Sequence, residues 1–156
     1  MIRWYSKIRN APEGDYSALI DALDWFESEY QKGRQEIQLQ GRLEDCAKRL
    51  PGLVEYYYRH LQELDAILQW FEINIHKVYI KHKTRYLEHY QRALSEKAAG
   101  ERAEAEQEYI DLKLLYNEVG LMRNQFFGIH KALDASNFQL SNIVRLRQAG
   151  IEDATI

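Results

Sequence analysis

The sequence predicts an all-α protein built on a long helical hairpin with coiled-coil seams and short helices near both ends of the chain. Two observations support this prediction. The 156 residues include only 2 Pro and 8 Gly, with 46% hydrophobic and 29% charged residues, a composition that favours long regular elements. Two separate stretches also repeat apolar residues in the alternating three- and four-residue spacing of a coiled coil. A chain of this length is expected to form one domain with its own core.

Residues 1–41 are predicted to be an N-terminal extension that contains a short acidic amphipathic helix over residues 16–31. Asp15 is a suitable N-cap, and apolar side chains recur at helical spacing from Tyr16 to Tyr30 before Gly33 interrupts the pattern. Residues 35–40 then alternate polar and apolar types. Six residues are a weak signal, so this segment is either a short strand or an extended linker.

A helical domain is predicted over residues 42–150, and its longest element is a helix over residues 52–98 that begins just after Pro51. Its seam consists of Leu53, Tyr57, Leu61, Leu64, Leu68, Phe71, Ile75 and Val78. Neither Gly nor Pro interrupts residues 53–99, so one helix of roughly 45 residues, about 65 Å long, is expected. A compact monomer cannot bury a helix of that length, which favours self-assembly.

A break at Ala98, Ala99 and Gly100 is predicted to separate this helix from a second one over residues 101–135. The second seam consists of Leu112, Leu115, Val119, Met122, Phe126, Ile129 and Leu133. Two matching seams on either side of a glycine predict an antiparallel helical hairpin.

A C-terminal assembly helix is predicted over residues 137–148, with Gly150 as its C-terminal cap and residues 151–156 as a tail. Its apolar side chains are Phe138, Leu140, Ile143, Val144 and Leu146. They cover more than one face of a short helix, and such a helix needs partners beyond its own hairpin. We therefore expect these five residues to form an oligomer interface.

Charge is segregated along the chain, although the net charge is only −3. Six bases between residues 76 and 97 face two acids, Glu88 and Glu96. Lys77, Lys81 and Arg85 follow at intervals of four residues and share one helix face. Basic side chains interleaved with aromatic rings suit sequence-independent binding of single-stranded DNA. The candidate DNA-binding residues are Lys77, Lys81, His82, Lys83, Arg85, Tyr86, Tyr90 and Arg92.

A plainer interpretation of this basic block is a solvated helix face whose lysines pair with acids of residues 101–118. That segment holds six acids against Arg102 and Lys113. Charge blocks of this kind are common on long helices. The aromatic side chains of the block are likewise more often part of a core or an interface than a base-stacking surface.

No catalytic constellation is found, so a non-enzymatic protein without cofactor or metal is expected. The sequence lacks a phosphate-binding GxxxxGK[ST] loop, and its five histidines form neither an HExxH nor a Glu-x-x-His pattern. The single cysteine, Cys46, excludes an intramolecular disulfide and fits a reducing cytoplasm. No segment has the apolar length of a secretory signal or a membrane span, so a soluble intracellular protein is expected.

Two stretches resemble the UvsY-type recombination mediators of T-even-like phages. The first comprises residues 50–57, reading LPGLVEYY, together with Leu87-Glu88-His89-Tyr90 at the end of the charged helix. The second comprises residues 126–135, reading FFGIHKALDA, and residues 138–147, reading FQLSNIVRLR. The resemblance covers residues 43–150. The chain departs from the family pattern where Gln91 and Arg92 follow Tyr90, and where Leu146 replaces a tryptophan.

This resemblance implies a ring-like homo-oligomer, a hexamer or heptamer, assembled in part through the C-terminal helix. It further implies binding to single-stranded DNA, to a RecA-like recombinase and to single-strand-binding protein in the cytoplasm of an infected host cell. Such a mediator helps load the recombinase onto DNA covered by single-strand-binding protein, in DNA recombination, repair and replication.

The main alternative is a structural or adaptor coiled-coil oligomer, such as a virion assembly factor or chaperone, that binds helices and not DNA. Both interpretations predict long helices and oligomers, and they differ in the role of the basic block. A metal enzyme is a more distant alternative.

Overall fold

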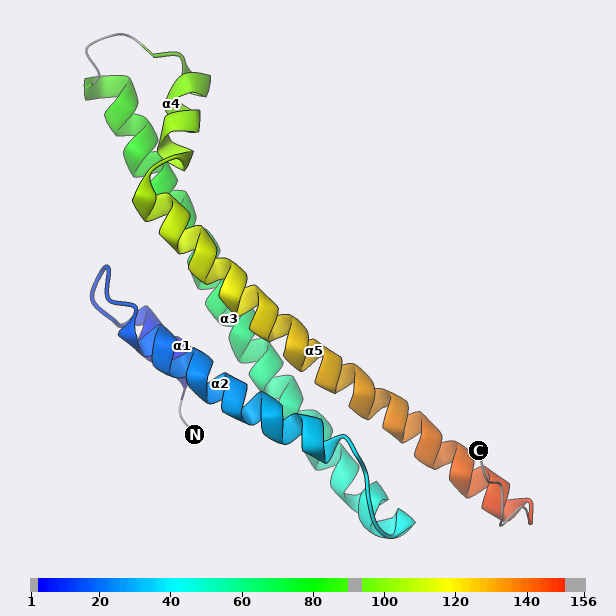
Figure 1. Ribbon diagram of the computed structural model, residues 1–156. Helices are drawn as coiled ribbons and strands as arrows, with labels where there is room; N and C mark the ends of the chain where they lie inside the picture. The colour runs from blue at the N-terminus through cyan, green and yellow to red at the C-terminus, as the bar shows by residue number, and fades with distance from the viewer. Residues whose placement is uncertain (1–2, 90–93, 151–156) are drawn as a thin grey trace.

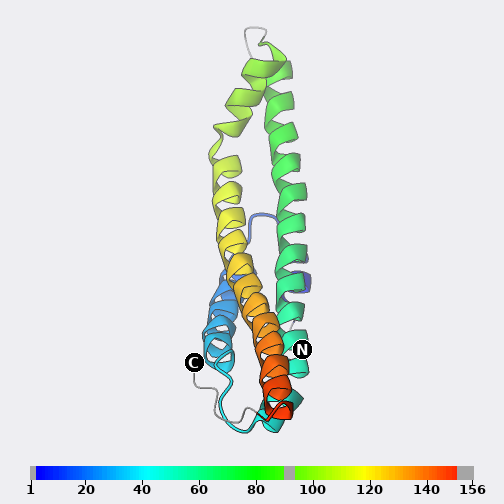
Figure 2. The same cartoon turned by 90° about the vertical axis from the view of Figure 1, so that its right-hand side faces the viewer.

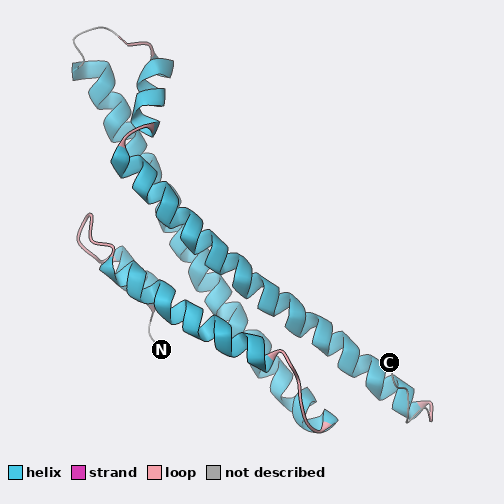
Figure 3. Cartoon of the chain, viewed as in Figure 1, coloured by secondary structure: helices cyan, strands magenta, loops and turns pink. Residues whose placement is uncertain are grey.

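The computed structural model describes residues 3–89 and 94–150, which form an elongated helical hairpin with a shorter helical layer along one side (Figure 1). In chain order the helices are α1 (Trp4–Arg9), α2 (Ser17–Glu36), α3 (Leu43–His89), α4 (Glu96–Glu104) and α5 (Gln107–Gln148). The described part of the chain has no strand, and Figure 3 shows only helices and loops there. The predicted all-α class is therefore confirmed, and residues 37–42 are a linker.

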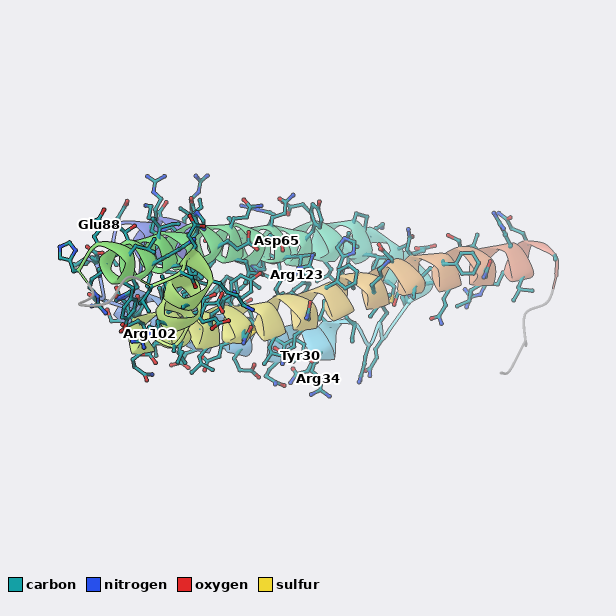
Figure 4. The ribbon with its side chains drawn as sticks, turned by 90° about the horizontal axis from the view of Figure 1, so that it is seen from above. Tyr30, Arg34, Asp65, Glu88, Arg102 and Arg123 are labelled. Atoms are coloured by element: carbon teal, nitrogen blue, oxygen red, sulfur yellow. The ribbon has the colours of Figure 1, made fainter. Side chains whose placement is uncertain are left out.

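The two predicted seams pack against each other, because α3 and α5 run antiparallel along most of their length (Figures 1 and 2). The fully buried side chains of this interface include Tyr57, Leu64, Ile67, Phe71, Val119, Phe126 and Leu133. Between the helices, Arg123 Nε donates a hydrogen bond of 2.9 Å to Asp65 Oδ1, and Figure 4 shows the two side chains facing each other. The predicted hairpin is confirmed.

Helix α2 lies along the half of the hairpin that is distant from α4 (Figures 1 and 2). Its Phe26 is buried against Phe126, with ring centroids 5.8 Å apart. The prediction that this helix ends at residue 31 was wrong. Gly33 lies inside α2, where an added Cβ would lie 2.5 Å from Ile129 Cδ1 and 3.0 Å from Tyr57 Cε1. Glycine is used here for close helix packing, and not as a helix end.

Helix α2 starts at Ser17 with Tyr16 as its N-cap, so Asp15 lies one position before the predicted cap. Asp15 Oδ1 nevertheless accepts a hydrogen bond of 2.9 Å from Ser17 N, the first N–H group of the helix. Before it, α1 is a six-residue helix that the sequence did not reveal. Trp4 and Ile8 are buried in the common core, and Tyr5 N donates to Glu63 Oε1 of α3 at 3.0 Å. The N-terminal segment is therefore packed on the hairpin through α1 and α2.

Helix α3 begins at Leu43, eight residues before Pro51, whereas the sequence predicted a start after the proline. Proline removes one backbone hydrogen bond and crowds the preceding turn, which normally interrupts a helix. Here Cys46 and Leu50 are both buried and continue the seam toward the N-terminus at the spacing of Leu53 and Tyr57. Their burial explains why the helix extends through Pro51.

The tip of the hairpin also differs from the prediction of one helix over residues 52–98 and a break at Gly100. Helix α3 ends at His89, and a separate helix, α4, follows Ser95, whose Oγ accepts a hydrogen bond of 3.2 Å from Ala98 N. Gly100 is buried within α4, where an added Cβ would lie 2.8 Å from Tyr79 Oη. As at Gly33, the missing side chain permits a close approach between helices.

Residues 107–135 of the predicted second helix and the predicted helix over residues 137–148 form one continuous helix, α5. The predicted start at residue 101 was wrong, because residues 101–104 belong to α4. Residues 134–137 contain neither Gly nor Pro, and Ser136 Oγ bonds to the carbonyl of Ala132 within the helix at 3.0 Å. The predicted glycine cap is confirmed, because Gly150 follows the helix with φ of +77°. The last turns of α5 lie apart from the first turns of α3 in Figure 1.

Candidate nucleic-acid interface

The predicted basic block lies at the tip of the hairpin, where the last turns of α3 meet α4 and the start of α5 (Figure 1). Its centre is His82, which continues the buried seam of α3 after Val78 and is only 5% exposed. His82 Nε2 lies 2.7 Å from Glu108 Oε2, and Nδ1 lies 3.9 Å from Glu106 Oε1. The imidazole therefore joins α3 to the start of α5 and does not face solvent.

Two exposed bases of α3 bind the same glutamates. Lys81 Nζ lies 3.1 Å from Glu108 Oε2, and the Arg85 guanidinium forms an ion pair with Glu106. Tyr86 Oη also donates a hydrogen bond to Glu106. The plainer interpretation of the charge pattern, that bases of this block pair with acids of residues 101–118, is confirmed for Lys81 and Arg85.

The same contacts stabilise the two carboxylates in their ionised forms. The hydrogen bond from Tyr86 lowers the pKa of Glu106, and Arg85 and His82 add to the effect. For Glu108, the hydrogen bond from His82 is the main cause of a lowered pKa, followed by the bond from Lys81. Both glutamates therefore stay ionised at neutral pH and neutralise part of the basic face.

The remaining predicted DNA-binding residues have different surroundings. Lys77 is exposed one turn before Lys81 on the same face of α3. Lys83 is half-buried, with Nζ 3.8 Å from Glu96 Oε2 of α4 and 6.0 Å from the centroid of the Tyr79 ring. Tyr90 and Arg92 lie outside the described residues.

The structure thus brings Lys77, Lys81 and Arg85 together on one exposed face. His82 is buried, and Tyr86 is half-buried with its hydroxyl bound to Glu106. The seam spacing of α3 continues from Val78 to His82, and this spacing accounts for the buried position of the histidine. The glutamate partners explain how a polar side chain remains buried there.

A second polar cluster, between α2 and α3, was missed by sequence reasoning. Glu29 is 5% exposed and accepts hydrogen bonds from Lys32 and from Tyr56 Oη, the latter at 2.6 Å. Burial alone raises the pKa of Glu29, but these hydrogen bonds outweigh it and the net pKa is lowered. Burial also raises the pKa of Tyr56 to about 12, with the Glu29 hydrogen bond contributing. The one sequence signal for the burial of Glu29 was its position between Phe26 and Tyr30, which belong to the apolar face of the helix.

His60 is buried beside this cluster, surrounded by aromatic rings. Its ring centroid lies 4.5 Å from that of Tyr56, 5.1 Å from Trp25 and 5.6 Å from Phe126. Burial lowers the pKa of the His60 imidazole, and the Glu29 carboxylate offsets only part of this effect. The neutral ring therefore behaves as one more aromatic member of the core.

The predicted oligomer-interface residues lie near the end of α5. Four of them are exposed: Phe138 by 67%, Ile143 by 41%, Val144 by 40% and Leu146 by 39%. Leu140 is partly buried and packs against the core of the same chain. Four large apolar side chains around one helix end form an unusual surface for an isolated chain.

Comparison of the chain with protein families, curated proteins and solved structures found no match. Among the described residues, no group of three or more His, Cys, Asp or Glu side chains is arranged to hold a metal ion. In the same part of the chain, none of the helices combines the length and apolar character needed to cross a lipid bilayer.

Proposed function

We propose that this protein is a non-enzymatic recombination mediator that binds single-stranded DNA through the exposed face of Lys77, Lys81 and Arg85. In this function it helps load a RecA-like recombinase onto DNA covered by single-strand-binding protein, in the cytoplasm of an infected host cell. The recombinase and the single-strand-binding protein are proposed from the resemblance of residues 43–150 to the UvsY-type mediators. The DNA-binding face is proposed from its own geometry.

The main support is that three bases share one exposed face and that the ion pair of Lys81 on this face is itself exposed. The side chain of Lys81 is 62% exposed and that of its partner Glu108 is 41% exposed. Ion pairs exposed on both sides contribute only about 0.2–1 kcal/mol. Phosphate oxygens offer the same charge and geometry as carboxylates, and phosphate binding also releases counterions from the nucleic acid. A phosphate of the DNA backbone can therefore replace Glu108 as the partner of Lys81 at little cost.

Self-assembly compensates for the small size of the face on each chain. Three bases per chain give weak binding, but an oligomer repeats the face, and a second contact to the same strand becomes intramolecular. A hexamer or heptamer would therefore hold a strand firmly at many weak points. Such binding deforms the strand and weakens its cover of single-strand-binding protein without breaking any covalent bond.

The direct test replaces Lys77, Lys81 and Arg85 together with Ala. Binding to fluorescent oligo-dT is expected to weaken at least tenfold, while sedimentation still shows the wild-type oligomer. Because each phosphate contact on a single strand contributes about 0.7 to the slope of log K against log salt, loss of three contacts lowers that slope by about 2.

A matched control replaces three exposed bases away from the tip and removes the same charge. Those residues are Arg3, Arg9 and Arg34. The control is expected to bind oligo-dT as the wild type does. If both variants lost affinity for oligo-dT equally, the loss would be an effect of overall charge. If neither lost affinity, the basic face would not be the DNA-binding surface.

A second candidate function is a structural or adaptor coiled-coil oligomer, such as a virion assembly factor or chaperone. The ion pairs of Lys81 and Arg85 with acids of the same chain favour it, because they leave less free positive charge. The exposed apolar side chains of α5 suit helix-binding partners. If the wild-type oligomer fails to bind oligo-dT even at low salt, this function replaces the mediator.

A further inference from the structure

The first turns of α3 and the last turns of α5 enclose a groove made of two adjoining hollows, about 450 and 440 Å³ in volume. The hollows share Leu50, Pro51 and Asn137. One end of the groove carries the acids Glu55 and Asp134, and the other end carries Arg145. The groove is thus apolar in the middle and has opposite charges at its two ends.

Four residues of α5 along this groove form a stripe with symmetric spacing. Asp134, Phe138, Ser141 and Arg145 are separated by four, three and four residues, so they lie within about 60° of one another around the helix. Phe138 is 67% exposed, the same value as Leu121, and Arg145 is exposed as well. The stripe therefore presents an acid, a large apolar side chain, a small side chain and a base, in that order.

A stripe in this order is complementary to itself when reversed. An antiparallel copy brings Arg145 opposite Asp134 and Ser141 opposite Phe138, so both charge and size match at every position. A two-fold contact requires this property, because each residue of a pair occurs once on either side of the axis. A partner of a different sequence has no reason to share the symmetric spacing.

We propose that two copies of this chain pair antiparallel along residues 134–145 of α5, each copy laying its Phe138 over Ser141 of the other. Asp134 of each copy then faces Arg145 of the other. Asp134, Ser141 and Arg145 line the groove, so the second copy covers both hollows. Phe138 and Val144, of which Val144 also lines the groove, become buried between α3 and α5 of the two copies.

The two hollows are lined by fifteen residues of α3 and α5, and exposed neighbours such as Phe138 add to this surface. A standard interface uses about 20–30 residues from each partner, so the groove supplies the larger part of such a contact. Because a two-fold contact joins chains in pairs, the complete oligomer has an even number of chains, which favours a hexamer over a heptamer.

This inference deepens the self-assembly part of the proposed function, and a charge exchange tests it. Asp134→Arg and Arg145→Asp each place like charges opposite each other twice per contact. Like-charge pairs across an interface are strongly unfavourable, so the dissociation constant from sedimentation is expected to rise roughly tenfold or more for each variant. The double variant reverses both partners and is expected to return to within about threefold of wild type.

Glu118→Arg is the matched control, because Glu118 is an exposed acid on α5 outside the stripe and the groove. It changes the net charge as Asp134→Arg does and is expected to leave the oligomer intact. Asp134 also lies 3.2 Å from His130 Nδ1 in the same helix, so circular dichroism should establish that helix content is unchanged in every variant.

A wild type that stays monomeric, single variants that assemble normally, or a double variant no better than the single ones would each overturn the pairing. Oligo-dT binding measured on the same samples separates this inference from the proposed function. Restored assembly in the double variant, without DNA binding by any oligomer, would support the pairing and contradict the mediator.

Discussion

Replacement of Gly33 by Ala tests the docking of α2 on the hairpin. The added Cβ would lie 2.5 Å from Ile129 Cδ1 and 3.0 Å from Tyr57 Cε1, and both neighbours are buried, so neither moves freely. Overpacking of this kind costs roughly 1–3 kcal/mol. Against this, replacing a helical glycine by alanine gains about 1 kcal/mol of helix propensity. The net result is a protein of equal or lower stability.

Gly120→Ala is the matched variant, because Gly120 lies inside α5 and a Cβ there meets nothing within 4 Å. It receives the propensity gain without the overlap, so it is expected to raise stability. The propensity term is common to both variants and cancels in their difference, which should be roughly 1–3 kcal/mol in the free energy of unfolding. Urea denaturation followed by circular dichroism measures that difference. If Gly33→Ala stabilises as much as Gly120→Ala, α2 does not pack as closely as described.

Two further predictions concern titratable groups. The folded-state pKa of His60 lies below the ordinary value of 6.5, so its contribution to stability is present above that pH and is lost as pH falls. The urea midpoint is expected to decrease from pH 7.5 to 5.5 in wild type and to decrease less in His60→Phe. At the tip, Glu106→Gln with Glu108→Gln removes the carboxylates that compete with phosphate. This double variant is expected to bind oligo-dT severalfold more tightly, and an unchanged or weaker affinity would contradict such competition.

The hairpin could be predicted from sequence because its signal is long and local. Two seams with regular three- and four-residue spacing identify both helices and the faces that they bury. The same spacing continues to Leu50 and Cys46 at one end and to His82 at the other. The predicted bounds at Gly33 and Pro51 were wrong because a single Gly or Pro was given more weight than this spacing.

Gly33 and Gly100 show why those residues could not be interpreted locally. A glycine that ends a helix and a glycine that admits a neighbouring helix look the same in sequence. The difference lies in contacts with Tyr57, Ile129 and Tyr79, which are distant along the chain. The six residues of α1 are too few to show a period, and α1 depends on burial of Trp4 and Ile8.

The charges of the candidate site could be predicted from the sequence, but the ion pairs between individual side chains could not. The alternation of basic and acidic segments indicated that residues 76–97 would meet residues 101–118. The choice of Glu106 and Glu108 as partners depends on where α3 ends and α5 begins, and the inward position of His82 follows from those partners. Once the bounds of the tip helices are known, the basic face reduces to Lys77, Lys81 and Arg85.

The most direct test of the proposed mediator is mass photometry of the wild-type protein at low salt, with and without oligo-dT. The proposed function predicts one oligomer whose mass increases by that of the bound strand and returns to its original value at high salt. An oligomer whose mass does not change with oligo-dT at low salt would contradict the proposed DNA binding.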